Sequence, residues 1–248
     1  EIAQCLVGSE MCIRDRGKEL TAGHGAGNNP AMGEKSAQES LADIEAILKK
    51  DTRMAFITAA MGGGTGTGAA PVIARLSKDM GILTVGIVSV PARFEGPKRL
   101  DQARDGLRRL KDHVDCLIVI DNEKIKSIYG SQTISQAFAK ANDVLNIAAK
   151  GIAEIITLPG YINVDFADVR TVMTDSGVAI MGAAQASGED RAIRAITEAL
   201  ESPLLNNNDI LGAKDILLNI TSGTDEITMD EMSQITSHII RKVGNNAA

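Results

Sequence analysis

The chain has 248 residues, of which 44% are hydrophobic and 23% are charged, and its formal net charge is −6. This composition is typical of a globular protein, and the length allows one large domain or two modest ones. An acidic surface repels phosphate groups, so the charge disfavours nucleic acid and anionic lipid as partners. The sequence also lacks a basic run and an apolar stretch long enough for direct membrane insertion.

The cysteines predict neither a disulfide framework nor a metal site. The chain has three cysteines, and Cys5 and Cys12 are spaced unlike a zinc pair, with no histidine beside them. We therefore expect a cytoplasmic protein in a reducing compartment.

The first sixteen residues, EIAQCLVGSEMCIRDR, show no helical or strand period and no turn chemistry. The string LVGSEMCIRDR looks like translated sequencing-adapter sequence, and a genuine disordered tail is the alternative. We expect residues 1–16 to be a non-native leader outside the fold. At the other end, residues 243–248 follow a helical pattern directly, which fits a natural end or a truncation.

The first half of the chain alternates apolar strands with helices. Apolar spacing predicts helices over Gly33–Lys50, Ala69 to about Met80, and about Arg99–Asp112. Continuous apolar runs predict strands at Met54–Ala60, Ile82–Val88 and Cys116–Ile120. Such strands between helices predict a parallel sheet that is covered on both faces.

A long helix is predicted from about Ser135 to Leu158, where Pro159-Gly160 ends it. Beyond it the pattern predicts a second, smaller α/β unit. Its expected elements are helices at Phe166–Met173, Glu189–Leu200 and Met229–Lys242, and strands at Gly177–Ala186 and Ile216–Thr221. We place the domain boundary near Pro159.

A glycine-rich turn, Gly62-Gly-Gly-Thr-Gly-Thr-Gly68, joins the Met54–Ala60 strand to the next helix. Such a turn presents several backbone N–H groups to one anion, and the helix start adds unpaired donors and partial positive charge. Glycine allows the close approach that any Cβ would block. A tight turn without a ligand is the plainer interpretation, but five glycines and two threonines in seven residues favour a phosphate site.

Two common phosphate motifs fit the turn poorly. A P-loop requires a lysine after the final glycine, and none follows this run. A dinucleotide fold requires an acidic residue at the end of the next strand, and that strand ends Val88-Ser-Val-Pro-Ala-Arg93. A dinucleotide-dependent oxidoreductase is therefore disfavoured.

Several segments together resemble the FtsZ family of tubulin-like GTPases in bacterial cell division. Gly62–Gly68 resembles the tubulin-signature loop GGGTGTG, Gly25–Pro30 resembles the phosphate loop GAGANP, and Phe94–Arg99 resembles FEGKKR. Ala137–Leu145 resembles the base-binding helix, and Asn163–Met173 resembles the catalytic synergy loop with its following helix. The resemblance covers residues 17–243 in family order and spacing.

The resemblance implies a tubulin-like α/β fold: a parallel-sheet GTPase domain, a central long helix and a smaller second α/β domain, both domains being incomplete. Residues 17–134 would be a partial GTP-binding domain, residues 135–158 the central helix, and residues 159–248 a partial C-terminal activation domain. The implied function is a GTP-binding and GTP-hydrolysing protein that polymerises head-to-tail into the cytokinetic ring at mid-cell. A non-hydrolysing nucleotide-binding scaffold paralogue is the alternative.

The resemblance assigns nucleotide contacts residue by residue. It implies that GTP or GDP is held by Ala26, Gly27, Asn28, Gly62, Gly63, Gly64, Thr65, Gly66, Thr67, Gly68, Glu95, Arg99, Asn122, Phe138 and Asn142. From spacing alone, Glu95 and Arg99 could simply pair with each other, and Asn122 could be a helix N-cap. Phe138 and Asn142 lie four apart on one helix face, where a ring can stack on a base while an amide bonds its edge.

The resemblance also implies the catalytic residues Asn163, Asp165 and Asp168, on a loop that reaches the nucleotide of the next subunit. From spacing alone the two aspartates could be an N-cap and a first-turn acid. Their presence favours hydrolysis over the scaffold alternative. Mg²⁺ would be held through the nucleotide phosphates. Other division proteins would bind through a tail that this sequence lacks.

The chain departs from the family pattern at its start. Nothing before Gly17 resembles the family's first strand and first glycine-rich loop, and the first three strands are missing. By analogy, the loss exposes an edge of the Met54–Ala60 strand. We therefore expect the 248-residue chain alone to bind GTP weakly or not at all. Milder departures are Asp121-Asn122-Glu123, Lys140 and Pro97.

Overall fold

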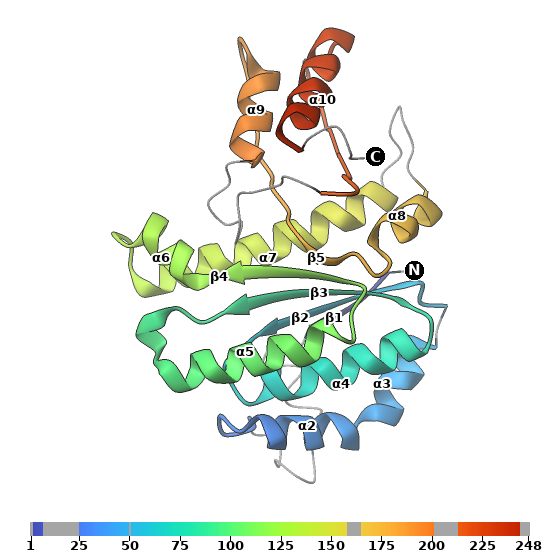
Figure 1. Ribbon diagram of the computed structural model, residues 1–248, viewed down its shortest axis with the longest axis vertical. Coiled ribbons are helices and arrows are strands. Elements are labelled where there is room, and N and C mark those ends of the chain that lie inside the picture. The colour runs from blue at the N-terminus through green and yellow to red at the C-terminus, as the bar shows by residue number, and fades with distance from the viewer. Residues whose placement is uncertain (1, 7–24, 50, 158–164, 201–212, 244–248) are drawn as a thin grey trace.

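The computed structural model describes residues 2–6, 25–49, 51–157, 165–200 and 213–243. Its centre is a five-stranded sheet in the order β1-β2-β3-β4-β5, and every neighbouring pair is parallel (Figure 1). The strands are β1 (Ile2–Leu6), β2 (Met54–Ala60), β3 (Leu83–Val90), β4 (Cys116–Asp121) and β5 (Gly177–Ala179). Because all strands run the same way, all of them end at one edge of the sheet.

One face of the sheet is covered by α2 (Pro30–Glu39), α3 (Leu41–Leu48), α4 (Thr65–Asp79) and α5 (Pro97–Lys111), which lie below it in Figure 1. Alternate residues of β2 point into this layer, where Ile57 is fully buried against Ile73 of α4 and Leu110 of α5. The other face is covered by α7 (Ile134–Thr157) and α8 (Phe166–Met173). The remaining β2 residues, Met54 and Phe56, pack into that second layer. The central strands β2, β3 and β4 are mostly apolar because both of their faces are buried.

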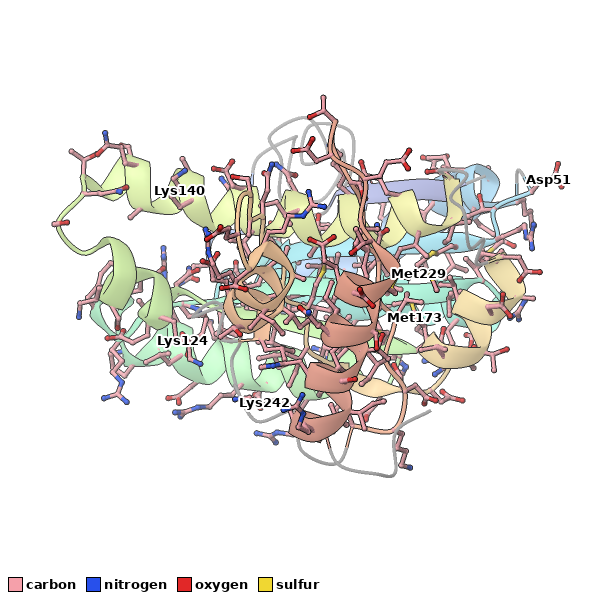
Figure 2. The ribbon with its side chains drawn as sticks, turned by 90° about the horizontal axis from the view of Figure 1, so that it is seen from above. Asp51, Lys124, Lys140, Met173, Met229 and Lys242 are labelled. Atoms are coloured by element: carbon pink, nitrogen blue, oxygen red, sulfur yellow. The ribbon has the colours of Figure 1, made fainter. Side chains whose placement is uncertain are left out.

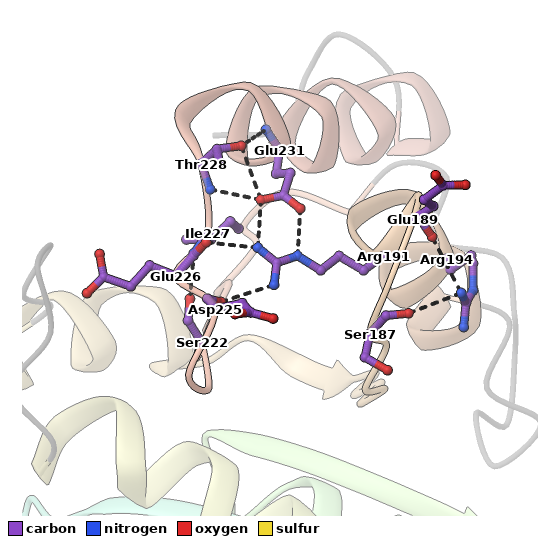
Figure 3. Close-up of polar contacts among 10 residues, drawn as sticks. All are labelled: Ser187, Glu189, Arg191, Arg194, Ser222, Asp225, Glu226, Ile227, Thr228 and Glu231. Carbon is purple, nitrogen blue, oxygen red and sulfur yellow. Dashed lines mark hydrogen bonds and ion pairs between the residues drawn. The ribbon is translucent and has the colours of Figure 1, made fainter.

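A third cluster joins α9 (Arg191–Leu200) and α10 (Met229–Val243) through Ile196, Ile235 and Ile239. Arg191 fastens the two helices (Figure 3): its Nε lies 2.6 Å from Glu231 Oε1, and its guanidinium also donates to the carbonyl oxygens of Asp225 and Glu226. The hydrogen bond from Arg191, together with that from the Thr228 N–H, lowers the pKa of Glu231 to about 2.

Most predicted elements of the first half are confirmed, with four differences. The predicted helix over Gly33–Lys50 is two helices that meet at Ser40, whose N–H bonds to Gln38 O. The helix after the glycine turn begins at Thr65, so the turn itself forms the first helical turn. A short helix, α6 (Asn122–Tyr129), was not predicted, and a 3₁₀ turn, η1 (Arg93–Glu95), precedes α5.

Of the two strands predicted for the second unit, one is shorter than expected and the other is wrong. Only Gly177–Ala179 of the predicted Gly177–Ala186 strand pairs, and it pairs with β4 of the first sheet. Residues 216–221 form no strand with any described residue. This segment separates two clusters, with Leu217 packed on the α7 layer and Ile216 and Ile220 on the α9–α10 cluster. Its apolar residues are therefore explained by packing against two clusters and not by strand pairing.

The exclusion of the leader from the fold is wrong for its first residues. Ile2–Leu6 forms β1 and pairs with β2 in the register Ile2 to Met54, so β1 covers the β2 edge that we expected to be exposed. Residues 7–16 lie outside the described residues, as does the predicted boundary at Pro159.

Candidate functional site

The candidate site lies at the edge of the sheet where the strands end. The glycine turn follows β2, η1 and the start of α5 follow β3, and α6 follows β4. Helix α7 also begins at this edge, on the left of Figure 1. Figure 2 shows Lys124 of α6 and Lys140 of α7 on this side of the molecule. Ligands of open parallel sheets bind at such an edge.

A hydrogen bond to Thr67, which belongs to the glycine turn itself, fixes the conformation of the turn. The backbone N–H of Gly62 donates to Thr67 Oγ1 at 2.9 Å, and Thr67 is almost fully buried. Gly62 has φ +96°, a conformation that favours glycine, and a Cβ there would lie 2.8 Å from the carbonyl oxygen of Arg99. The turn therefore passes directly over the start of α5.

The turn continues into α4 at Thr65, with Gly64 as its N-cap and no side-chain cap. The first backbone N–H groups of a helix have no intrahelical partner, and they carry the positive end of its dipole. The chain thus gathers several N–H donors at one point, as an anion site requires.

The second predicted phosphate loop, Gly25–Asn29, lies against the glycine turn. The N–H of Ala26 is 3.5 Å from Thr65 Oγ1. A Cβ at Gly64 would lie 2.7 Å from the backbone nitrogen of Asn29, so only glycine permits this approach. The structure therefore brings together two segments that lie far apart in sequence.

The bend of this loop is unusual. Gly27 and Asn28 both have φ +58°, the left-handed region that glycine and asparagine tolerate. Gln102 of α5 supports the bend by donating from Nε2 to the carbonyl oxygen of Asn28 at 3.2 Å. Sequence reasoning missed Gln102, although it lies three residues after Arg99, on the same face of a helix.

Glu95 and Arg99 lie beside the turn and bond to each other. Arg99 Nη1 is 3.0 Å from Glu95 Oε2, while Glu95 Oε1 accepts from the N–H of Ala92 at 3.0 Å. The side chain of Glu95 is 14% exposed and that of Arg99 is 52% exposed, so the guanidinium remains available to a ligand. The spacing argument for an ion pair therefore holds in this structure.

Asn122 has a buried Oδ1 atom with no hydrogen-bond partner among the described residues. It is not the N-cap of α6, because Asp121 takes that place and accepts from the N–H of Glu123 at 2.9 Å. An unpartnered buried amide oxygen at the end of β4, on the same edge of the sheet as the glycine turn, is suited to a ligand donor. Next to it, Glu123 accepts from the N–H of Arg93 at 2.8 Å, which lowers the pKa of Glu123.

Phe138 and Asn142, which the resemblance assigns to the base, lie in the first half of α7. Asn142 is exposed, and the side chain of Phe138 lies outside the described residues. Asn142 and Thr65 are carried by helices that both begin at this edge, on opposite faces of the sheet (Figure 1).

The acidic pair lies elsewhere. Asp165 and Asp168 begin α8, which lies near the edge where the strands begin (Figure 1). They form a reciprocal cap: Asp165 Oδ1 accepts from the N–H of Asp168 at 2.9 Å, and Asp168 Oδ2 accepts from the N–H of Asp165 at 3.1 Å. The predicted capping role is present, and the second oxygen of each carboxylate has no hydrogen bond to a described residue. Asn163 lies outside the described residues.

The described residues contain no group of three or more His, Cys, Asp or Glu side chains that could hold a metal ion. Within the same residues, no helix is long and apolar enough to cross a membrane. The buried thiol of Cys116 is no candidate nucleophile, because burial raises its pKa to about 11.

Two family descriptions match the chain. Residues 9–130 match the Tubulin/FtsZ family GTPase domain, and residues 177–248 match the FtsZ family C-terminal domain. The cell division protein FtsZ of Porphyromonas gingivalis is 50% identical over 221 residues, which are 88% of this chain and 48% of that protein. FtsZ of Buchnera aphidicola is 49% identical over 232 residues, covering 93% of this chain and 60% of that protein. The chain therefore spans about half the length of the curated relatives it matches.

Solved structures agree with these matches. The empty FtsZ dimer from M. jannaschii superposes with a TM-score of 0.84 at 43% identity, covering 94% of this chain and 67% of that one. CetZ1 from Haloferax volcanii, a GDP-bound monomer, has a TM-score of 0.76 at 20% identity and shows the fold alone. The resemblance inferred from the motifs and the predicted tubulin-like α/β fold are confirmed. The chain belongs to the Tubulin/FtsZ family and is similar to FtsZ cell division proteins along most of its length.

Proposed function

We propose that the protein binds GTP at the glycine-turn edge and hydrolyses it only when a second subunit stacks head to tail. The observation that carries this proposal is the separation of the two functional sets. The phosphate loops lie where the strands end, and the acidic pair of α8 lies near the edge where they begin (Figure 1). Because the phosphate loops and the acidic pair lie on opposite sides of one chain, a second subunit is needed to bring them together.

The residues at the nucleotide edge fit GTP by their chemistry. The backbone N–H groups at the start of α4, which have no intrahelical partner, and those of the bend at Gly27 and Asn28 are suited to phosphate oxygens. Arg99 lies beside the turn with its guanidinium half exposed. The unpartnered Oδ1 of Asn122 can accept a hydrogen bond from the nucleoside. The exposed side-chain amide of Asn142 can hydrogen-bond to the nucleoside as well. Mg²⁺ would bridge phosphate oxygens, with few protein ligands.

The chemistry assigned to α8 is positioning and polarisation. Water attacks the γ-phosphorus of GTP, the bond to the β-phosphate oxygen breaks, and GDP and inorganic phosphate leave. Phosphoryl transfer needs little covalent help, so an oriented water and charge neutralisation carry it. Each α8 carboxylate has one oxygen in the cap, and its other oxygen is suited to hold that water.

Head-to-tail stacking repeats one heterologous contact and yields a filament. This fits a cytoskeletal protein of bacterial division at mid-cell, which the resemblance to FtsZ cell division proteins supports. The M. jannaschii relative is described as a dimer, which also supports self-association. Other division proteins would bind to segments beyond this chain.

The test must separate the capping role of Asp168 from catalysis. In the full-length protein, Asp168→Asn keeps an oxygen that can accept from the N–H of Asp165, but it removes the charge. We expect phosphate release from GTP to fall sharply while GTP affinity is unchanged. Asp43→Asn, in the first turn of α3, is the matched control and should hydrolyse normally. Normal turnover by Asp168→Asn and Asp168→Ala would remove the α8 acids from the mechanism, whereas no phosphate release by the wild type would favour the scaffold paralogue.

A further inference from the structure

Three contacts attach α8 and the turn after it to α4 and to the segments just before β2 and β3. None of them involves a residue assigned to nucleotide binding. Lys78 Nζ, on the last turn of α4, lies 2.8 Å from Asp175 Oδ1 in the turn after α8. Arg170 Nη2 donates to the carbonyl oxygen of Gly81 at 3.4 Å. The guanidinium of Arg53 lies 4.2 Å from the centre of the Phe166 ring, a cation–π contact.

Lys78 is the centre of this attachment. Its ammonium also lies 3.4 Å from Asp115 Oδ1 and donates to the carbonyl oxygen of Val114 at 3.3 Å. Asp115 has a side chain that is only 8% exposed, and its Oδ2 accepts from the N–H of Thr84 at 2.8 Å. The aspartate is thus fixed in the sheet, and it holds the ammonium in one place.

The turn after α8 is bonded to the same point of the sheet. The N–H of Gly177 donates to the carbonyl oxygen of Asp115 at 3.1 Å. Asp175 has φ +51°, which turns the chain from α8 into β5. Lys78 therefore bridges a buried carboxylate of the sheet and an exposed carboxylate at the end of α8, whose exposed fractions are 8% and 74%.

We propose that Lys78 is a positioning residue for hydrolysis: through its bridge to Asp115 and Asp175 it fixes the orientation of α8, and so of Asp165 and Asp168. This inference rests on the proposed function. Lys78 touches neither nucleotide nor water in this assignment. Because Lys78 bonds to the buried Asp115 and to the exposed Asp175 at once, it is suited to fixing the orientation of α8 on the sheet.

The same bridge connects the two edges of the molecule. Helix α4 has 15 residues, about 22 Å of helix, and runs from the glycine turn at Thr65 to Lys78. Its first turn lies at the nucleotide edge and its last turn holds α8. Lys78 therefore attaches α8 to the end of α4 that is farther from the glycine turn.

The test uses two variants of the full-length protein. Asp175→Asn removes the exposed charge while keeping a residue that tolerates the left-handed backbone, and Lys78→Met removes the ammonium with little change in volume. We expect kcat for GTP to fall roughly 2- to 30-fold in both, the range for residues that couple distant sites. GTP affinity should be unchanged, and Lys78→Arg should restore most of kcat.

The matched control is Asp51→Asn. Asp51 is exposed, has φ +54°, lies on the same side of the molecule as α8 (Figure 2), and makes no ion pair with a described residue. Its kcat should equal that of the wild type. Full kcat in Asp175→Asn and Lys78→Met would overturn the inference, as would equal losses of kcat and GTP affinity.

Asp168→Asn separates the two proposals. If Asp168→Asn loses turnover while Asp175→Asn and Lys78→Met keep it, Lys78 has no positioning role and the split site stands. If all three retain turnover, the acids do not act in hydrolysis and both proposals fall.

Discussion

Single residues decide how closely the two phosphate loops approach. Gly64 is in contact with the Ala26–Asn29 loop, and a Cβ there would lie 2.7 Å from the nitrogen of Asn29 and 2.9 Å from Cβ of Ala26. Gly63, its neighbour, has open space around the same position. Gly64 is therefore required for the close approach of the two loops, whereas Gly63 is not.

We predict that Gly64→Ala lowers the free energy of unfolding by about 1–3 kcal/mol, because the added methyl group forces the loops apart. Gly63→Ala should change it by less than about 0.5 kcal/mol. Urea unfolding followed by circular dichroism measures both. Equal effects of the two substitutions would contradict the geometry described for this turn.

The Arg191–Glu231 pair predicts a pH dependence. The folded-state pKa of Glu231 is about 2 and its ordinary value is 4.5, so its contribution to stability is complete above pH 4.5 and is lost as the pH falls towards 2. We expect the melting temperature of the wild type to exceed that of Glu231→Gln at neutral pH, and the difference to shrink below pH 4.5. Calorimetry across this range measures it. Glu198→Gln, an exposed site on α9, should show no such trend.

At the scale of elements, α8 combines a cap and the proposed catalytic acids. Asp165 is its N-cap, and replacing an aspartate N-cap by alanine costs about 1 kcal/mol. We predict this loss for Asp165→Ala and a far smaller loss for Asp165→Asn, which keeps the accepting oxygen. Thermal unfolding of both variants is the measurement, and equal losses would show that the cap contributes little.

How far the sequence predicts an element depends on what forms it. Phe166–Met173 and Met54–Ala60 have the predicted bounds because their patterns and end signals lie within the segment itself. The strand expected at Ile216–Thr221 is wrong, because a strand also needs a partner, and a short apolar run alone does not provide one. Helix α6 was missed because it follows β4 without a break, and its cap, Asp121, ends the strand.

The site shows the same division. Motif resemblance assigned the glycine turn, and the structure sets the predicted loop Gly25–Pro30 against it. Gln102 and Lys78 belong to no motif that we recognised, because their partners lie 74 and 36 or more residues away. Contacts of such separation arise from the packing of the helices on the sheet, which local patterns do not encode. The assigned nucleotide and catalytic roles stay predictions.

At the scale of the whole molecule, the split site predicts complementation. A full-length variant impaired at the glycine turn, Gly64→Ala, keeps intact acids, while Asp168→Asn keeps intact phosphate loops. A mixture should form some contacts that combine intact loops with intact acids. We expect phosphate release by the mixture to exceed the average of the two separate variants. Release equal to that average would indicate that each chain carries a complete site.

The parallel sheet has a final consequence for any stack of such subunits. All five strands of the described sheet run the same way, so the edge where they begin and the edge where they end carry different side chains. One terminus of a stack would leave an unshared glycine turn facing solvent, and the other would leave an unshared α8. Subunits would then be added and lost at unequal rates at the two termini. The polymer would be polar because the two edges of the parallel sheet in each subunit differ.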